Sequence, residues 1–523
     1  MKFSKYISIK RTPQSVAIPG AGQVPNSAGG HAWKVDPWMQ LDRFLILGTE
    51  GGTYYIGEPK LTRDSAANTL ALINEDGERV VSRIVEISQA GRAPKNGPAI
   101  FALALCAAFG EAPTRRAAFA VLPKVCRTGT HLFQFATECD ELRGWGRGLR
   151  RAVGNWYAQS EPDALSYQAI KYQQRDGWSH RDLLRLSHPK PPTEGHKVLF
   201  KWIADRELTG ENARIEAFER LSKAEKPDEA AQLIREFRLP RESVPTALMA
   251  NAEVWEALLE EMPMTALVRN LANMTRCGLL TVGSEAAQKV VSELNDRERI
   301  RKARIHPIAV LLAMSTYGSG AGLRGKGTWT PVPAITDALN EAFHLAFANV
   351  EPTRKRLLLG VDVSGSMAMS SVAGTSMKAN LAATAMAMVT IASEPKCVPM
   401  AFTSEFKPLN LTPKMRLPEA LALTSNQSFG RTDCALPMIF ATKQKIPVDV
   451  FVVYTDSETW YGNVHPTEAL AEYRRRTGIP AKLAVMAMCG NAFTIADPRD
   501  PGMLDVVGFD ASVPQALREF ALV

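Results

Sequence analysis

The chain has 523 residues, a formal net charge of +8 and 46% hydrophobic residues, a composition typical of folded globular proteins. It is too long for one hydrophobic core, so we expect two or more domains. No segment reaches the roughly 18 consecutive apolar residues that a membrane-spanning helix needs. The basic N-terminal stretch lacks the apolar core of a secretory signal. These patterns predict a cytoplasmic protein with no membrane partner.

Cysteine usage and charge limit the function further. The seven cysteines include no Cys-x-x-Cys pair, which argues against a zinc site or a disulfide framework and predicts reduced, buried thiols. The first 351 residues carry 45 Lys and Arg against 39 Asp and Glu, an excess of +6; the rest carry 17 against 15, an excess of +2. An excess this small makes an RNA-binding surface only where the basic residues cluster.

Residues 36–350 have a helical pattern almost throughout. Apolar residues recur at spacings of three and four, as in Val80, Ile84 and Ile87, and the breaks carry Gly, Pro, Asn or Asp. The predicted helices include Gly77–Ala90, Pro98–Phe109, Thr114–Lys124, Thr130–Leu142, Arg147–Gln159, Asp163–Gln173 and His180–Leu186.

The spacing of these helices is compatible with two architectures. Helices start about every 16–20 residues, so helix pairs recur at about 40 residues, which is the period of HEAT-type repeats whose pairs stack into a curved solenoid. A multi-helix bundle fits the same spacing. Residues 1–35 precede the helical region and are expected to be a separate segment that could pack on the C-terminal domain.

After Asn349, residues 351–523 alternate between strands and helices. Short apolar runs predict buried strands at Arg356–Asp362, Val448–Tyr454 and Ala481–Met488, and an Ala- and Met-rich stretch predicts a helix at Met377–Ala392. This alternation is typical of an α/β domain with a doubly wound, Rossmann-like parallel sheet.

Small oxygen-bearing side chains follow the predicted strands of this domain. Ligands of such sheets bind beyond the carboxyl ends of the strands, so the loops that carry these side chains should meet at one edge. Carboxylates and hydroxyls suit a hard divalent cation, and capping of strand–helix junctions is the alternative role. The five candidate metal ligands are Asp362, Ser364, Ser366, Thr432 and Asp456.

This set resembles the metal-ion-dependent adhesion site (MIDAS) of von Willebrand factor A domains. The resemblance implies Mg²⁺ as the cation, although oxygen ligands alone would also admit Ca²⁺ or Mn²⁺. The family usually has Gly-Gly where this chain has Gly430-Arg431, so a bulky cationic side chain is expected beside the metal. Asp433 and Ser457 are expected to support or cap the site and not to bind the metal.

Basic residues cluster in two stretches of the helical region, Arg115–Arg151 and Lys171–Lys201. Lys171 and Arg175 are four residues apart, so we expect both to project from one helical face. Arg and Lys at this spacing can follow phosphates, and His188 just beyond a helix end can stack on RNA or donate to it. Each of these residues alone is more often an ordinary solvated charge.

The stretch Lys171–His188 resembles the signature of the TROVE module of Ro ribonucleoproteins, as do Glu261–Thr275 and His306–Lys326. With the A-type domain, the resemblance to the bacterial, Rsr-type members of this family covers nearly the whole chain. It implies a ring of HEAT-like helices closed by the A-type domain. The candidate RNA-binding residues are Lys171, Arg175 and His188, from the resemblance, and Arg150, Arg181 and Arg185, from charge and proximity.

The resemblance also implies partners. In the family, Y RNA binds the outer surface of the ring, and single-stranded 3′ ends of misfolded or precursor RNAs enter the central hole. Bacterial relatives act with exoribonucleases such as polynucleotide phosphorylase in RNA quality control, rRNA maturation and stress survival. The leading hypothesis is therefore a non-catalytic RNA-binding scaffold with no DNA partner.

Two other functions remain as alternatives. One is a metal-dependent protein adhesion module on a helical solenoid without RNA. The other is a metal nuclease, which the sequence disfavours because a single Asp/Ser/Thr site offers no evident general base and no second metal site.

Overall fold

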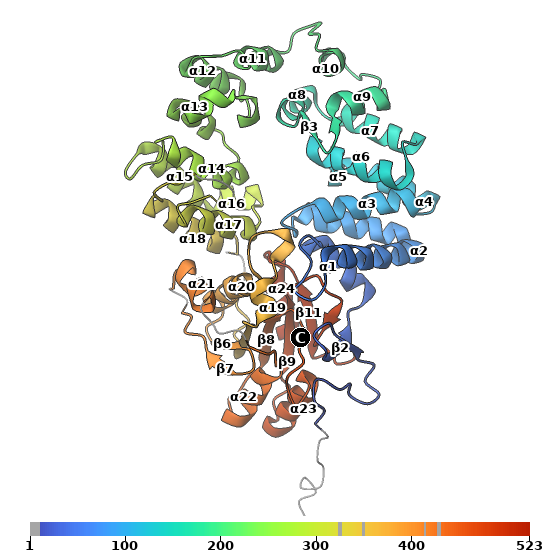
Figure 1. Cartoon of the computed structure of the whole chain (residues 1–523), viewed down its shortest axis with the longest axis vertical. Coiled ribbons are helices and arrows are strands. Elements are labelled where there is room, and N and C mark those ends of the chain that lie inside the picture. The colour runs from blue at the N-terminus through green and yellow to red at the C-terminus, as the bar shows by residue number, and fades with distance from the viewer. Residues whose placement is uncertain (1–10, 323–326, 348–350, 413–414, 426–429) are drawn as a thin grey trace, which may run out of the picture.

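The computed structural model describes residues 11–322, 327–347, 351–412, 415–425 and 430–523. Residues 323–326, at the end of the His306–Lys326 motif, lie outside the described residues. Figure 1 shows an arc of helices above an α/β domain. The two parts meet where the first and the last helices of the arc reach the sheet.

The helical part runs from α1 to α18, and consecutive helices pack on one another, as α2 does on α3 and α12 on α13. Its helices are α1 Pro37–Leu47, α2 Glu58–Ala90, α3 Gly97–Phe109, α4 Ala112–Ala120, α5 Leu122–Val125, α6 Gly129–Arg143, α7 Arg147–Gln159, α8 Pro162–Lys171, α9 His180–Ser187, α10 Glu194–Asp205, α11 Ala213–Leu221, α12 Pro227–Phe237, α13 Ala252–Leu259, α14 Met264–Arg276, α15 Glu285–Asn295, α16 Arg297–Ala303, α17 Pro307–Gly318 and α18 Pro333–Leu345. Two short strands, β3 Gln174–Arg175 and β4 Trp178–Ser179, and two 3₁₀ turns, Arg241–Ser243 and Thr246–Ala250, interrupt them.

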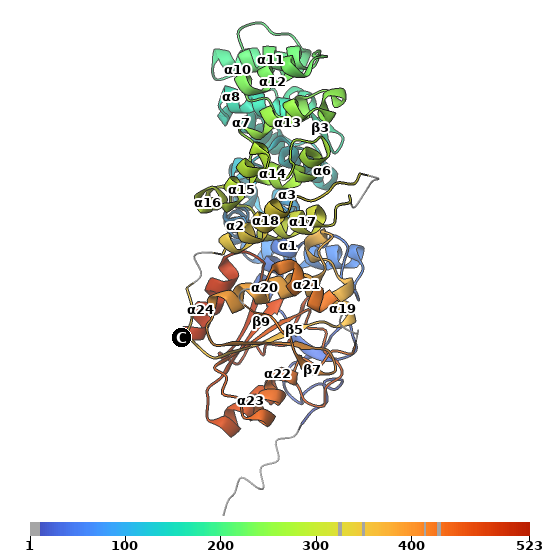
Figure 2. The same ribbon diagram turned by 90° about the vertical axis from the view of Figure 1, so that its left-hand side faces the viewer.

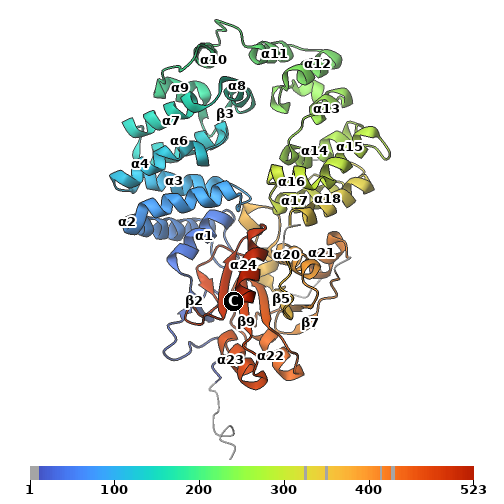
Figure 3. The same ribbon diagram turned by 180° about the vertical axis from the view of Figure 1, so that it is seen from behind.

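The helices form a ring and not a compact bundle, as Figures 1 and 3 show. The arc closes where the end of α2 meets the α16–α17 junction. There Arg304 donates to the carbonyl of Gln89 at 2.9 Å, and a ring nitrogen of His306 lies 3.1 Å from the carbonyl of Arg92. Each pair is more than 200 residues apart in sequence, so no local pattern predicts the closure.

Three predicted helices differ clearly from the structure. The helix expected at Thr114–Lys124 is divided at Val121 into α4 and α5. The helix expected from Gly77 belongs to the longer α2, which has a kink at Asp76, where φ is −152° and the carboxylate caps the amide of Arg79. The helix expected to reach Gln173 ends at Lys171, because Tyr172 leaves helical geometry. Apolar spacing locates helix interiors well and their ends poorly, since an end depends on one residue's backbone angles.

The α/β domain has one six-stranded sheet in the order β11-β9-β8-β5-β6-β7, parallel except for β7. Its elements are β5 Leu357–Asp362, α19 Gly365–Met369, a 3₁₀ turn Val372–Gly374, α20 Ala379–Ser393, β6 Cys397–Phe402, β7 Phe406–Pro408, α21 Leu417–Ser425, α22 Leu436–Gln444, β8 Val450–Thr455, α23 Pro466–Thr477, β9 Lys482–Ala487, β10 Phe493–Thr494, β11 Met503–Val507 and α24 Ser512–Leu522. The doubly wound sheet expected from the sequence is confirmed.

Alternate residues of the central strands pack into two different cores. Leu358 and Phe451 face α22 and α23, whereas Leu359 and Val452 face the side of the sheet where α20 lies. Figure 2 shows these helices on opposite sides of the sheet. The core on the α20 side continues into the helices of the ring, so ring and sheet share buried apolar surface.

The N-terminal segment packs on the α/β domain. Strands β1 Val24–Pro25 and β2 His31–Lys34 pair with each other, and β2 also pairs with β10. The side chain of Gln14 is fully buried and donates to a carboxylate oxygen of Asp433 at 2.7 Å. The described part of this segment is therefore integral to the α/β domain, whereas residues 1–10 lie outside the described residues.

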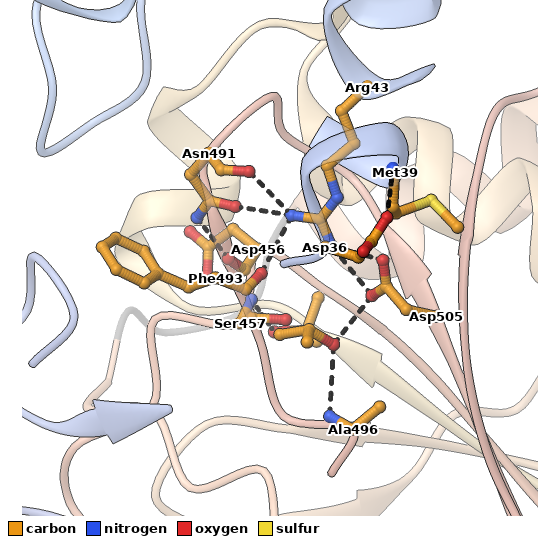
Figure 4. A network of polar contacts seen from close by, with 11 residues as sticks. Asp36, Met39, Arg43, Asp456, Ser457, Asn491, Phe493, Ala496 and Asp505 are labelled. Carbon is orange, nitrogen blue, oxygen red and sulfur yellow. Dashed lines mark hydrogen bonds and ion pairs between the residues drawn. The ribbon is translucent and has the colours of Figure 1, made fainter. Parts of the chain in front are cut away.

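A buried arginine of α1 joins the ring to the sheet. Arg43 is 1% exposed, and its guanidinium donates to both carboxylate oxygens of Asp505 on β11, at 2.7 and 2.8 Å. It also donates to the backbone and side-chain oxygens of Asn491, as Figure 4 shows. A buried charge needs such partners because its loss of hydration is expensive.

All seven cysteines are free thiols and five of them are buried, whereas Cys277 and Cys397 are partly exposed. Within the described ranges, no helix combines the length and the apolar character required to cross a lipid bilayer.

We expect Arg43→Met to destabilise the protein strongly. The substitution leaves the carboxylate of Asp505 buried without its cation, a loss that costs about 3–5 kcal/mol for buried pairs. Chemical denaturation measures the effect. Arg475→Met is the matched control, because it removes an exposed pair with Glu472, worth about 0–1 kcal/mol. Equal losses of stability in the two variants would contradict the role of Arg43.

Candidate cation site and nucleic-acid interface

The candidate cation ligands lie at the carboxyl edge of the sheet. Asp362 ends β5, Ser364 and Ser366 open α19, and Asp456 directly follows β8. The backbone amide of Ser364 donates to Asp362 at 2.9 Å, and the hydroxyls of Ser364 and Ser366 are 3.2 Å apart. The hydroxyl of Ser366 lies close enough to Asp456 to favour the charged form of its carboxyl group and so to lower its pKa against the effect of burial. The structure thus brings four of the five predicted residues into one linked cluster.

Thr432, the fifth candidate, lies in the loop before α22 and is 2% exposed. Its carbonyl accepts from the amide of Trp460 at 3.2 Å and from the hydroxyl of Thr459 at 3.4 Å. These bonds hold its loop against the segment that follows Asp456, as expected for loops that meet at one sheet edge.

Asp362 and Asp456 are both buried, and burial raises the pKa values of their carboxyl groups. Asp362 is fully buried, and its pKa is raised to about 7, first by burial and then by the charge of Asp456. Burial also raises the pKa of Asp456. Two carboxylates in one buried site repel each other unless a proton or a cation intervenes.

The donor set fits a hard divalent cation. Carboxylate and hydroxyl oxygens are the ligands that Mg²⁺ and Ca²⁺ prefer. Across the described ranges, no group of three or more His, Cys, Asp or Glu side chains could hold a metal. A cation at this site therefore depends on the serine and threonine hydroxyls in addition to the two carboxylates.

Three residues near the site were not among the predicted ones. Glu458 is 1% exposed, and burial and then Asp456 raise its pKa to about 7. Asn491 donates to the backbone carbonyl of Asp456 at 2.6 Å (Figure 4). Burial and then the charges of Asp456 and Glu458 raise the pKa of Tyr55 to about 12, because the α1–α2 loop holds this phenol near both carboxylates. Only the tertiary structure identifies Tyr55, because it lies far from the strands of the sheet in sequence, whereas Asn491 follows β9 and could have been found from the same rule.

Arg431, which replaces the second glycine of the family pattern, lies against aromatic rings. Its guanidinium is 4.9 Å from the ring centre of Tyr461 and 5.5 Å from that of Trp460. Gly430 is required next to it, since a Cβ there would come within 2.8 Å of the hydroxyl of Thr403.

The candidate RNA-binding residues Lys171 and Arg175 do not share a helical face, and that prediction is wrong. Lys171 is the last residue of α8, and Arg175 lies in β3 of a hairpin. Asp176 and Gly177 form its turn, both with positive φ, which is the Asp-Gly signal of a two-residue hairpin. Arg175 is consequently carried outward, with 66% of its side chain exposed.

Lys171 lies on the wall of a cavity of about 270 Å³ that also has four arginines and three glutamates on its walls. Its ammonium is 3.4 Å from the hydroxyl of Tyr167 and about 5.5 Å from the ring centre of Tyr172. These contacts hold a half-buried lysine beside aromatic rings, a combination that suits a phosphate and a base.

His188 ends α9 in the left-handed conformation, with φ of 45°, and is exposed. The guanidinium of Arg150 donates to the carbonyl of Ser187, the residue before His188, at 3.5 Å. Arg181 is exposed on the first turn of α9. Arg185 is already paired with Asp205 at 3.0 Å, so much of its charge is neutralised. The predicted residues therefore lie on α7, α8, α9 and the hairpin between α8 and α9. Five of them are exposed and Lys171 is half-buried, and Arg185 is the weakest candidate.

Comparisons with known proteins agree with this architecture. The TROVE domain model matches residues 24–240 and 235–319, and the Ro60 vWA domain model matches residues 356–521. The RNA-binding protein RO60 of Deinococcus radiodurans is 42% identical over 95% of both chains. The RNA-binding protein RO60 of Caenorhabditis elegans is 35% identical over 98% of this chain and 92% of its own.

A solved structure has the same fold. The crystal structure of the Deinococcus radiodurans RO (RSR) protein matches with a TM-score of 0.72 and 41% identity, covering 93% of this chain and 99% of that one. With a ring of helices, an A-type sheet and an Asp/Ser/Thr cluster at its edge, this chain belongs to the Ro60 family of TROVE and vWA domain proteins.

Proposed function

We propose that this protein is a non-catalytic RNA-binding scaffold. The observation that carries the proposal is the set of exposed basic residues around α8 and α9, which we take as one face. They lie in the TROVE domain of a chain whose relatives are named RNA-binding proteins. Y RNA binds this face through Lys171, Arg175 and His188. Single-stranded 3′ ends of misfolded or precursor RNAs enter the ring, and exoribonucleases such as polynucleotide phosphorylase act on the RNAs so held.

The geometry of this face supports recognition of RNA shape. Arg175 on an exposed hairpin and Arg181 on α9 are available to phosphates. Among the described residues, Arg175 pairs only with its neighbour Asp176, at 4.0 Å. Lys171 lies beside two tyrosine rings, and His188 lies beyond a helix end. Both side chains can donate hydrogen bonds to RNA. Such contacts recognise a folded RNA mainly through its backbone and its unstacked bases.

The cation site has a separate role in the proposal. A divalent cation, with Mg²⁺ the simplest choice, is held by Asp362, Ser364, Ser366, Thr432 and Asp456. The cation offsets the repulsion between the two buried carboxylates and braces the sheet edge.

A second candidate function, metal-dependent protein binding, is favoured by the apolar rim of this site. Met369 and Tyr54 are 60% and 55% exposed, and the backbone of Tyr54 is bonded to Ser370. Tyr461, 43% exposed, is bonded to the carbonyl of Thr432. Sequencing the RNA that co-purifies with the native protein separates the two candidates, since an adhesion module without RNA binding would carry none.

We expect the triple substitution of Lys171, Arg175 and His188 to alanine to weaken Y RNA binding at least tenfold at moderate salt. Each lost phosphate contact lowers the slope of log affinity against log salt by about one. Fluorescence anisotropy over a salt series measures both quantities. The control removes two exposed basic residues from the α/β domain, Lys407→Ala with Arg475→Ala. If the triple variant keeps full affinity, the assignment of this face is wrong.

We expect Mg²⁺ to raise the thermal unfolding midpoint of the protein and a chelator to lower it. At a cation concentration one hundred times the dissociation constant, binding to the folded state adds about 2.7 kcal/mol of stability. Asp456→Asn should abolish the shift, because it removes a carboxylate ligand. Glu419→Gln, an exposed acid on α21, should leave it unchanged. A shift that persists in Asp456→Asn places the cation elsewhere.

A further inference from the structure

A cavity of about 360 Å³ lies between α3, α4, α6 and α7, and none of the residues assigned above lines it. We name it the α7 pocket. Figures 1 and 3 show α4 and α7 on the outer side of the helical arc. Four arginines line it: Arg115, Arg116, Arg143 and Arg147.

The charge of the α7 pocket is unbalanced. No acidic side chain lines it, and none of its four arginines takes part in an ion pair within the part of the chain that the structure describes. Two cavities next along the ring contain acids, such as Glu260 in one and Asp205 in the other. A concentration of one sign of charge in a hollow indicates an anionic ligand.

Backbone contacts fix two of these arginines. Arg115 donates to the carbonyl of Gly110 at 2.8 Å, and Arg143 donates to the carbonyl of Ala107 at 3.0 Å. Each guanidinium has five N–H donors, so most of them stay available to a ligand. Arg116 and Arg147 are exposed and can close on the ligand from the solvent side.

The start of α7 adds backbone donors to the pocket. Gly146 at the N-cap supplies no side-chain hydrogen bond, and the first turn contains no acid. The first amide that bonds back to the start of α7 is that of Arg150, to the carbonyl of Gly146, so the amides of the first three helical residues have no partner within the helix. Such amides and the positive end of the helix dipole favour anions.

Glycines allow close approach at this point. A Cβ on Gly148 would come within 2.7 Å of the ring of Phe119, so glycine lets α7 lie directly against that ring. A Cβ on Gly146 would meet nothing within 4 Å, so the helix start is open. Phe119 is only partly covered, and its ring supplies an apolar wall beside the arginines.

We infer that the α7 pocket binds a terminal phosphate, as carried by the 5′ end of an RNA strand or by a free nucleotide. Four guanidiniums exceed the single charge of an internal phosphodiester, whereas a phosphate monoester carries about −1.5 to −2 near pH 7. Arginine binds phosphate oxygens through paired N–H groups. The volume lies at the small end of the range for ligand pockets, about 300–1,000 Å³, enough for one nucleotide and not for a duplex. If the ligand is the 5′ end of an RNA, the inference rests on the proposed RNA-binding function. If the ligand is a free nucleotide, it does not.

The test compares short single-stranded RNAs that differ only at the 5′ end, together with a nucleoside triphosphate as a competitor. Fluorescence anisotropy with a label at the 3′ end measures binding. We expect the 5′-phosphorylated RNA to bind at least about tenfold more tightly than the 5′-hydroxyl RNA, the gain of one or two charge-assisted hydrogen bonds. Arg116→Ala with Arg147→Ala should remove this preference, and both residues are exposed, so the fold is retained.

Two further variants separate the possible causes. The double substitution Arg116→Lys with Arg147→Lys keeps both positive charges but loses the paired N–H groups of arginine. It should therefore retain part of the preference for the 5′-phosphorylated RNA. The triple substitution of Lys171, Arg175 and His188 to alanine should lower the affinity for both RNAs by the same factor and leave the preference for the 5′-phosphorylated RNA intact. Direct binding of the nucleoside triphosphate, lost in Arg116→Ala with Arg147→Ala, identifies a free nucleotide as the ligand even if no RNA binds. Equal binding of the two RNAs and no nucleotide binding would overturn the inference.

Discussion

The whole arrangement depends on the buried guanidinium of Arg43. This side chain comes from the first helix of the ring and satisfies its charge in the α/β domain, on Asp505 and Asn491. Because an unpaired buried charge is very costly, α1 cannot leave the sheet without exposing or stranding it. The pairing therefore sets where the ring begins relative to the sheet, and a core continuous with the ring helices covers one face of that sheet.

The contacts of Arg43 extend to the candidate cation site through Asn491. Asn491 accepts from Arg43 and donates to the carbonyl of Asp456 and, at 3.3 Å, to Glu458. The α1–α2 loop brings Tyr55 to the rim of the site. The candidate cation site thus lies among parts of the chain that also anchor the ring, the placement on which the proposed bracing role of a bound cation depends.

The basic residues of the ring differ in how free their charge is. Arg185 and Lys201 share Asp205, whereas the arginines of the α7 pocket have no acid on its walls. Counting Lys and Arg along the sequence treats these residues alike. Whether a charge can bind a phosphate depends on whether a carboxylate already lies within reach, and across helices that is a matter of packing.

The sequence by itself determined the class of both domains, the central strands, most helix interiors and four linked members of the cation cluster. These follow from local periodicity and from the rule that parallel strands end at one edge. Only the tertiary structure decided the closure of the ring, the covering of the cation site and the separation of Lys171 from Arg175. Arg43 and Asp505 are 462 positions apart, so no local pattern encodes their meeting. The Asp-Gly turn after Arg175 was a local signal, but whether a short hairpin or one more helical turn forms there depends on a few backbone angles that packing against α6 settles.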